Sequence, residues 1–229
     1  MRKIFSSLII LHSLISYSQN DSSIVKFNQI RFSLSAGLDY LMNKSIDHYV
    51  SSSADSLKYD KINPMNVGLF YCATFGYGYK GNALDIVYEH SDVMAVISNS
   101  NADIYDATKR YEEFFHYNRI TLGILYSRQL LIKNVGIFEG SIGLLKHHIR
   151  FRNSYASDPL DFGPGDYKIA ESCGLGVRLS ASLLVALPNS NFSFGFGINS
   201  NYARIPNMIV NLDYFSIGGF GKIIYNIKW

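Results

Sequence analysis

The sequence contains few charged residues, few prolines and cysteines, and no long apolar run beyond its first twenty residues. Of its 229 residues, 17% are charged, five are Pro, two are Cys and one is Trp. This low charge argues against a disordered chain and against a nucleic-acid-binding protein, because both classes carry many more charges. Beyond residue 20, apolar runs such as Leu183 to Leu187 are five residues long, which is too short for a membrane-crossing helix.

Aromatic residues are abundant instead. Seventeen Tyr and fifteen Phe make up most of an aromatic content of 14%, which favours a β-rich chain over a helical one. The length allows one large all-β domain or two small ones. A formal net charge of +3 indicates no strongly charged partner, and we expect no nucleic acid among the partners.

The N-terminal residues have the features of an export signal. Met1-Arg2-Lys3 is basic, the stretch from Ile4 to Ile15 is mostly apolar, and Ser16 and Ser18 are small. This order predicts a signal peptide over residues 1–18, followed by a periplasmic N-terminal tail over 19–29. Export without a helical anchor leaves three classes, namely a periplasmic protein, a secreted protein and an outer-membrane β-barrel over 30–229.

Apolar and polar residues alternate in eight segments. The segments are 32–40, 66–78, 84–89, 119–126, 138–144, 172–181, 192–199 and 217–229. A soluble sandwich or a lipocalin-like barrel would also alternate, but its polar face would carry Lys, Glu, Asp and Thr. Here the polar face is mainly Gly, Ser, Asn and Thr, which suits the narrow lumen of a small barrel. The pattern therefore predicts that the apolar face contacts lipid.

The connections between these segments differ in length. Short ones are expected at 80–82, 128–134 and 188–190, and long ones at 42–65, 91–114 and 150–168, with a shorter one near 204–211. Short turns on one side and long loops on the other are typical of outer-membrane barrels. The sequence thus predicts an all-β fold, an eight-stranded antiparallel up-and-down transmembrane β-barrel, with both termini in the periplasm.

The C-terminal residues carry the most specific short motif. Ile223, Tyr225, Ile227 and the final Trp229 alternate, which resembles the assembly signal of outer-membrane proteins. The chain is thereby similar to small bacterial outer-membrane β-barrels of the OmpA-transmembrane-domain and OmpX type. Its export signal is similar to that of many Bacteroidota barrel proteins, including the PorT-like group. The resemblance implies a location in the outer membrane of a Gram-negative bacterium. It also implies contact with outer-membrane lipid, with lipopolysaccharide and with the barrel-assembly machinery.

Several charged residues fall on the inward face. The predicted lumen charge network consists of Asp85, Glu89, Arg119, Glu139 and Arg178, and all of these except Asp85 are expected within a few residues of one height. Asp39 and Lys222 share this inward face. Such charges could line a polar pathway, but a mutually paired network that closes a narrow barrel is the preferred interpretation, because unpaired buried charges are costly.

Residues that could carry chemistry have simpler interpretations. Adjacent His147 and His148 would point to opposite faces of a strand and could not share one metal ion. Cys72 and Cys173 fall on opposite faces, so a disulfide between them is not expected. We therefore expect no enzyme activity, no cofactor and no metal site.

The functional hypothesis is a non-enzymatic barrel whose long loops act at the cell surface, in adhesion, binding of a protein partner or envelope integrity. Two alternatives remain open. One is a membrane-embedded lipid-modifying hydrolase with a histidine such as His116 as the base. The other is an accessory subunit of a secretion or uptake system.

Overall fold

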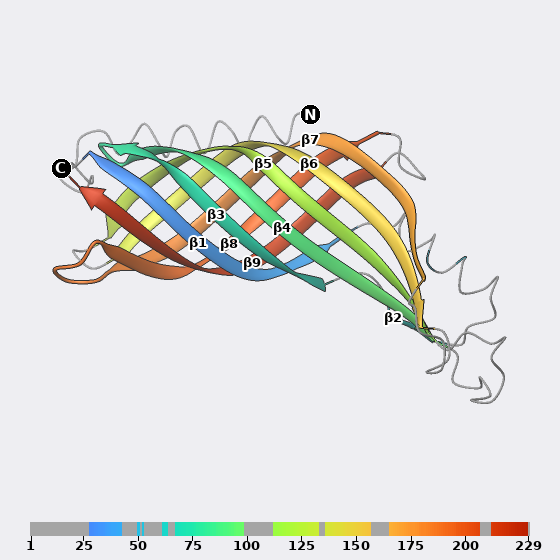
Figure 1. The fold of residues 1–229 in the computed structure, drawn as a ribbon. Helices are drawn as coiled ribbons and strands as arrows, with labels where there is room; N and C mark the ends of the chain where they lie inside the picture. The colour runs from blue at the N-terminus through green and yellow to red at the C-terminus, as the bar shows by residue number, and fades with distance from the viewer. Residues whose placement is uncertain are drawn as a thin grey trace.

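The alternating segments of the sequence become strands that pair antiparallel in chain order around a barrel (Figure 1). The computed structural model describes residues 28–42, 50, 52, 61–63, 67–98, 112–132, 136–156, 165–206 and 212–228. The barrel strands are β1 (Gln29–Leu41), β3 (Val67–Tyr79), β4 (Asn82–Ser98), β5 (Glu112–Ile132), β6 (Gly136–Ala156), β7 (Gly165–Ala186), β8 (Phe192–Ile205) and β9 (Leu212–Lys228). Pairing of β1 with β9 and of β4 with β5 completes the circle. The predicted fold class, an eight-stranded antiparallel barrel, is confirmed.

The tightest connection shows how local sequence sets the strand register. Lys80 and Gly81 join β3 to β4, and both have positive φ, at 48° and 75°. A two-residue hairpin turn of this kind matches the right-handed twist of the strands it connects. Asn82, the first residue of β4, then links this turn to β5. Its Oδ1 accepts hydrogen bonds from Tyr126 Oη at 2.6 Å and from Arg128 Nη1 at 3.3 Å.

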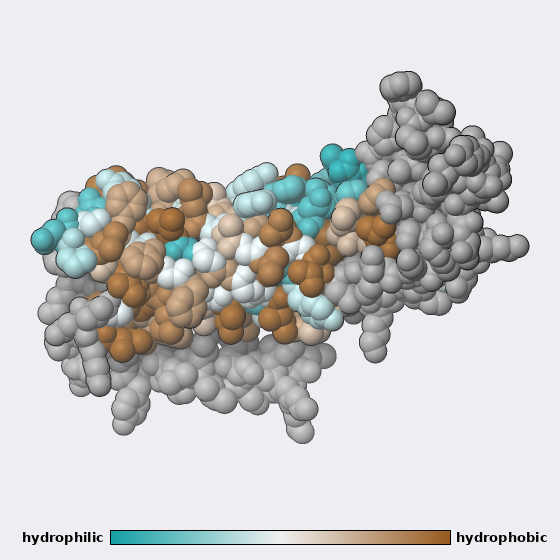
Figure 2. All heavy atoms as spheres, turned by 90° about the horizontal axis from the view of Figure 1, so that it is seen from below, coloured by the Kyte–Doolittle hydropathy of each residue, from teal (hydrophilic) through white to brown (hydrophobic). Residues whose placement is uncertain are grey.

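On the face of the barrel seen in Figure 2, apolar side chains cover much of the described outer wall. Leu175, Leu144 and Phe196 are 74%, 73% and 68% exposed, and many other Leu, Ile, Val, Phe and Tyr side chains point outward. The predicted assignment of faces is therefore correct for the apolar residues. The inward glycines leave room for large inward side chains. A Cβ atom at Gly143 would collide with Leu125, and one at Gly76 would collide with Asp85.

The strands on one side of the barrel are longer than the sequence indicated. β5, β6 and β7 have 21, 21 and 22 residues, whereas β1 and β3 have 13 each. The long strands extend beyond the others at the end of the barrel opposite the two-residue turn (Figure 1). Residues 91–98, 112–114, 150–156 and 165–168, expected in loops, are strand. A short strand, β2 (Lys61–Asn63), pairs with the far end of β4.

Some predictions fall outside the described residues. These are the signal peptide over 1–18, most of the tail over 19–29, the remaining parts of the long loops, and Trp229. They stay predictions. Among the described residues, no helix has the length and apolar character needed to cross a bilayer.

Candidate functional site

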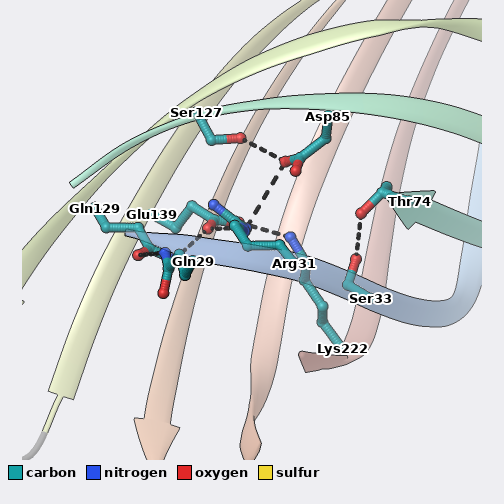
Figure 3. A network of polar contacts seen from close by, with 9 residues as sticks. All are labelled: Gln29, Arg31, Ser33, Thr74, Asp85, Ser127, Gln129, Glu139 and Lys222. Carbon is teal, nitrogen blue, oxygen red and sulfur yellow. Dashed lines mark hydrogen bonds and ion pairs between the residues drawn. The ribbon is translucent and has the colours of Figure 1, made fainter. Parts of the chain in front are cut away.

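Near the turn end of the lumen, four charged side chains form a group that we call the lower cluster: Arg31, Asp85, Glu139 and Lys222 (Figure 3). The Glu139 carboxylate accepts from Arg31 Nη2 at 2.6 Å and from Lys222 Nζ at 2.6 Å. Gln129 Nε2 adds a third bond to Glu139 at 2.8 Å. Arg31 Nη2 also lies 3.8 Å from Asp85 Oδ2. Two cations thus face two carboxylates.

A second group, the upper cluster, lies higher in the lumen and contains Asp39, Glu89, Arg119 and Arg178. Arg119 Nη2 donates to Asp39 Oδ2 at 2.8 Å and to Glu89 Oε1 at 2.7 Å. Arg178 Nη2 reaches the other Glu89 oxygen at 2.6 Å, and its Nε donates to Asn201 Oδ1 at 2.6 Å. All four charged side chains are buried, and again two cations balance two carboxylates. Each cluster is neutral as a whole, which is the condition for keeping charges inside a protein.

The five residues proposed from the sequence therefore divide between two clusters instead of forming one ring. Glu89, Arg119 and Arg178 belong to the upper cluster, and Asp85 and Glu139 belong to the lower one. Sequence reasoning missed Arg31, which completes the lower cluster. Arg31 shares the alternating face of Asp39, and this parity is the signal that identifies it, but the predicted segment 32–40 begins one residue after it.

Apolar side chains fill the lumen between and above the clusters. Phe70, Cys72, Val87, Leu125 and Leu145 form a buried group, and Phe220 packs against it with its ring 6.3 Å from that of Phe70. A cavity of about 30 Å³ lies beside this group, lined by Asp85, Arg178 and Lys222 among others. This volume holds about two water molecules. The buried apolar side chains thus occupy part of the lumen at this level.

At the long-strand end, a larger apolar group is buried in the interior. We call it the upper core: Leu41, Val50, Val93, Ala95, Phe115, Tyr117, Ile149, Phe151, Ala203 and Ile205. The Phe115 and Phe151 rings stack with centroids 5.9 Å apart. Just below this group, buried His147 Nδ1 lies 2.9 Å from Thr121 Oγ1. His148 points to the opposite face, as expected for neighbouring residues of a strand.

Three of the predicted assembly-signal residues, Ile223, Tyr225 and Ile227, lie on β9, and Trp229 is outside the described residues. Ile223 and Ile227 are 55% and 47% exposed on the outer wall. The ring of Tyr225 lies 4.8 Å from that of Phe192 on β8. Their role in assembly stays a prediction.

The outer wall of β6 and β7 carries a polar group directly above the apolar belt. His148 Nδ1 lies 3.2 Å from Cys173 Sγ, and His148 Nε2 lies 2.7 Å from Glu171 Oε1. His116, proposed as the base of an alternative hydrolase, instead has its Nδ1 3.8 Å from Asp92 Oδ2. Cys72 is buried and Cys173 exposed, and both are free thiols. Within the described residues, no group of three or more His, Cys, Asp or Glu side chains is arranged to hold a metal ion.

Neither a protein-family model nor a curated protein sequence matches the chain. Among solved structures, the chain is similar to Neisserial surface protein A, with 12% identity, 90% of this chain and 100% of that one covered, and a TM-score of 0.43. Ail of Yersinia pestis, in complex with the heparin analogue sucrose octasulfate, has 10% identity, coverages of 89% and 100%, and a TM-score of 0.40. The translocator domain of autotransporter NalP from Neisseria meningitidis has 9% identity, coverages of 99% and 96%, and a TM-score of 0.30. These likenesses concern general barrel architecture and do not support a PorT-like or Bacteroidota assignment.

Proposed function

We propose that this chain is an outer-membrane β-barrel of a Gram-negative cell that acts at the cell surface while its lumen stays closed. The observation that carries the proposal is the distribution of side chains across the wall. Large apolar residues such as Leu144 and Leu175 point outward, and paired charges such as Glu89 and Arg119 point inward. A belt of exposed apolar side chains around a closed barrel is stable in lipid and would aggregate in water.

The difference between the two ends gives the orientation. β1 starts and β9 ends at the end that carries the two-residue turn, as the first and last strands of Figure 1 show. Short turns face the periplasm in outer-membrane barrels, so the extended ends of β4 to β7 project from the cell. The surface formed there, together with the loops between these strands, is the part available for adhesion, for a protein partner or for maintaining the envelope.

The lumen supports a binding or structural role in preference to transport. Two neutral ion clusters and the upper core occupy successive levels of the interior. Water-filled channels in outer-membrane proteins are found in much wider barrels than one of eight strands. We therefore assign the function to the surface end and the outer wall.

A two-part experiment tests this proposal. Membranes from expressing cells are separated by density, and intact cells are treated with a protease that cannot enter them. We expect the protein in the outer-membrane fraction, with cleavage only at the long-strand end. Protein recovered in the soluble periplasm would contradict the location.

Comparison of cells with and without the protein then separates the roles. Loss of adherence at unchanged detergent resistance supports surface binding, and the reverse supports envelope integrity. A stoichiometric partner that co-purifies from native membranes would instead favour the accessory-subunit alternative.

A further inference from the structure

Three side chains on the outer wall form a chain from thiol to imidazole to carboxylate. Cys173 on β7 faces His148 on β6 directly across the strand pair. Cys173 Sγ lies 3.2 Å from His148 Nδ1, and His148 Nε2 lies 2.7 Å from Glu171 Oε1. A nucleophile beside a base, with the base oriented by a third group, is the arrangement that activates nucleophiles in acyl transfer.

The two ring nitrogens of His148 have separate roles in this geometry. When Nε2–H donates to Glu171, the Nδ1 lone pair faces the thiol and can accept its proton. Glu171 then stabilises the resulting imidazolium, as the carboxylate does in other catalytic triads. Arg150 Nε donates to the same Glu171 oxygen at 2.8 Å and so holds the carboxylate in place.

The position of the thiol indicates the class of substrate. Cys173 is exposed, and the next outward residue on β7 is Leu175, at the upper edge of the apolar belt. Lys146, opposite Leu175 on β6, is exposed as well. In a bilayer, the ester bonds of a lipid lie where acyl chains meet headgroups. That boundary falls at the level of Cys173, with the cations of Lys146 and Arg150 available to anionic headgroups.

We propose that Cys173, His148 and Glu171 form a thiol acyl-transfer site that acts on the acyl esters of membrane lipids. His148 takes the thiol proton, and the thiolate attacks the ester carbonyl carbon. The carbon–oxygen bond of the ester then breaks, and His148 returns the proton to the leaving alcohol oxygen. The acyl group is now a thioester on Cys173. Water, deprotonated by His148, attacks this thioester, which releases the fatty acid and restores the thiol.

This inference goes beyond the proposed function, and it departs from the expectation that the chain is not an enzyme. It also replaces the hydrolase arrangement suggested by sequence, in which His116 was the base. The reaction occurs on the outer wall and needs neither the lumen nor the loops. It rests on the proposed membrane location only in its choice of substrate.

The first test measures the thiol without any membrane. The folded barrel in detergent is treated with iodoacetamide at neutral pH, and alkylation of Cys173 is followed by mass spectrometry of the peptide that contains it. We expect His148→Gln to slow alkylation at least about tenfold. The matched control is His90→Gln. His90 on β4 lies in the same row of paired residues as His148, with Ile120 of β5 between them. This substitution should leave the rate of Cys173 alkylation unchanged. Equal rates in all three proteins would overturn the activated thiol, whatever the location of the barrel.

The second test measures turnover. The protein is inserted into vesicles of phosphatidylethanolamine and lipopolysaccharide, and free fatty acid and acylated protein are measured. We expect fatty acid release and a hydroxylamine-sensitive acyl adduct on Cys173. Cys173→Ala should abolish both, and His148→Gln should slow release by about 100-fold, the lower range for loss of a general base. Cys72→Ala, which removes the thiol inside the barrel, should behave like the unmodified protein.

Insertion of every variant is checked by the shift in electrophoretic mobility that a folded barrel shows on heating. No release from correctly inserted, unmodified protein overturns the acyl-transfer site and leaves the membrane proposal intact. An acyl adduct on Cys173 that forms without release of fatty acid would mean that the thioester is not hydrolysed. This result overturns the catalytic cycle and makes Cys173 a site of lipid attachment. Failure of the unmodified protein to insert contradicts the membrane proposal itself, and the alkylation result then stands alone.

Discussion

The two ends of the barrel distribute polar and apolar side chains in opposite ways. In the turn-end half of β6, buried Glu139 points into the lumen and Leu144, 73% exposed, points out. Farther along the same strand, Ile149 and Phe151 are buried inside and Arg150 is exposed outside. β4 repeats the change, from Asp85 inside and Ile86 outside to Val93 inside and Asp92 outside.

The inversion agrees with the proposed membrane location, in which the same strands are surrounded by two different solvents. Where the wall faces lipid, charged side chains have only the lumen available to them, and they must be paired there. Where the wall faces water, the ordinary pattern of a soluble protein returns, with an apolar interior and a polar surface. Under the proposed location, the change between the two patterns marks the upper membrane boundary and places it between Leu144 and His148 on β6.

The largest expected effect comes from removing a lumen charge. Arg119→Ala leaves Asp39 and Glu89 without their shared donor in a buried site, so the free energy of unfolding should fall by about 3–5 kcal/mol. The matched control lies above the boundary on the outer wall. Arg150 bonds Glu171 but is 52% exposed, and Arg150→Ala should cost about 0–1 kcal/mol.

Urea unfolding in lipid vesicles measures both variants, with tyrosine fluorescence as the signal. Equal losses of stability at the two positions would contradict the division into a lipid-surrounded half and a water-surrounded half.

The next effect comes from placing a charge on the outer wall. Leu179 lies near the middle of the outward apolar residues of β7, which run from Leu175 to Val185. Leu179→Arg should destabilise the inserted barrel by about 2–4 kcal/mol if this position is near the bilayer midplane. Leu175→Arg, near the boundary, should cost less. Met94→Arg, outward but above the boundary, should cost about 0–1 kcal/mol. Urea titration in vesicles measures the series, and a flat result across the three positions would contradict the boundary.

The inversion also explains which parts of the fold could be predicted from sequence. Alternation with an apolar outer face identified all eight strands and most of their inward residues in the membrane half, with Arg31 as an exception. The same rule placed the strand ends at 91–98 and 150–156 in loops, because it requires an apolar outer face and these ends have an apolar inner face. On β6, Ile149 and Phe151 alternate with Arg150 and Arg152 in a pattern that would have predicted a soluble strand. The strand ends were missed because one solvent was assumed for the whole length.

The candidate sites divide in the same way. Inward charges could be found from alternation alone, since facing the lumen is a property of each strand by itself. Their partition into two clusters depends on how far each strand is shifted against the next, which alternation does not determine. The proximity of His148 to Cys173 depends on register as well, because the two residues lie on different strands and meet only when β6 and β7 pair. Considered without the strand register, His148 and Cys173 therefore each have an ordinary structural interpretation.

A smaller effect is expected from removing one methylene group inside the upper core. Ile149 is fully buried there, and Ile149→Val should cost about 0.5–1.5 kcal/mol, because the surrounding side chains only partly fill the space. Ile124 is 53% exposed on the lipid-facing wall, and Ile124→Val should cost less because mobile acyl chains fill the gap. The same unfolding measurement compares the pair. An Ile124→Val variant that loses as much stability as Ile149→Val would indicate that this part of the wall packs against protein.

The smallest expected effect is on ion conduction, because single substitutions inside the lumen should leave the current across a bilayer unchanged. Unmodified protein in a planar bilayer should carry no steady current, because the ion clusters and the upper core block the lumen at different heights. Lys222→Ala removes one cation of the lower cluster, yet the stacked rings of Phe115 and Phe151 remain above it. A dry apolar constriction excludes ions even where a polar path reaches it. The current should therefore stay at background in Lys222→Ala, and equally in Phe115→Ala, where the ion clusters persist. Stable, ion-selective currents from the unmodified protein would show that the two halves do not close the barrel, and transport would then become the leading function.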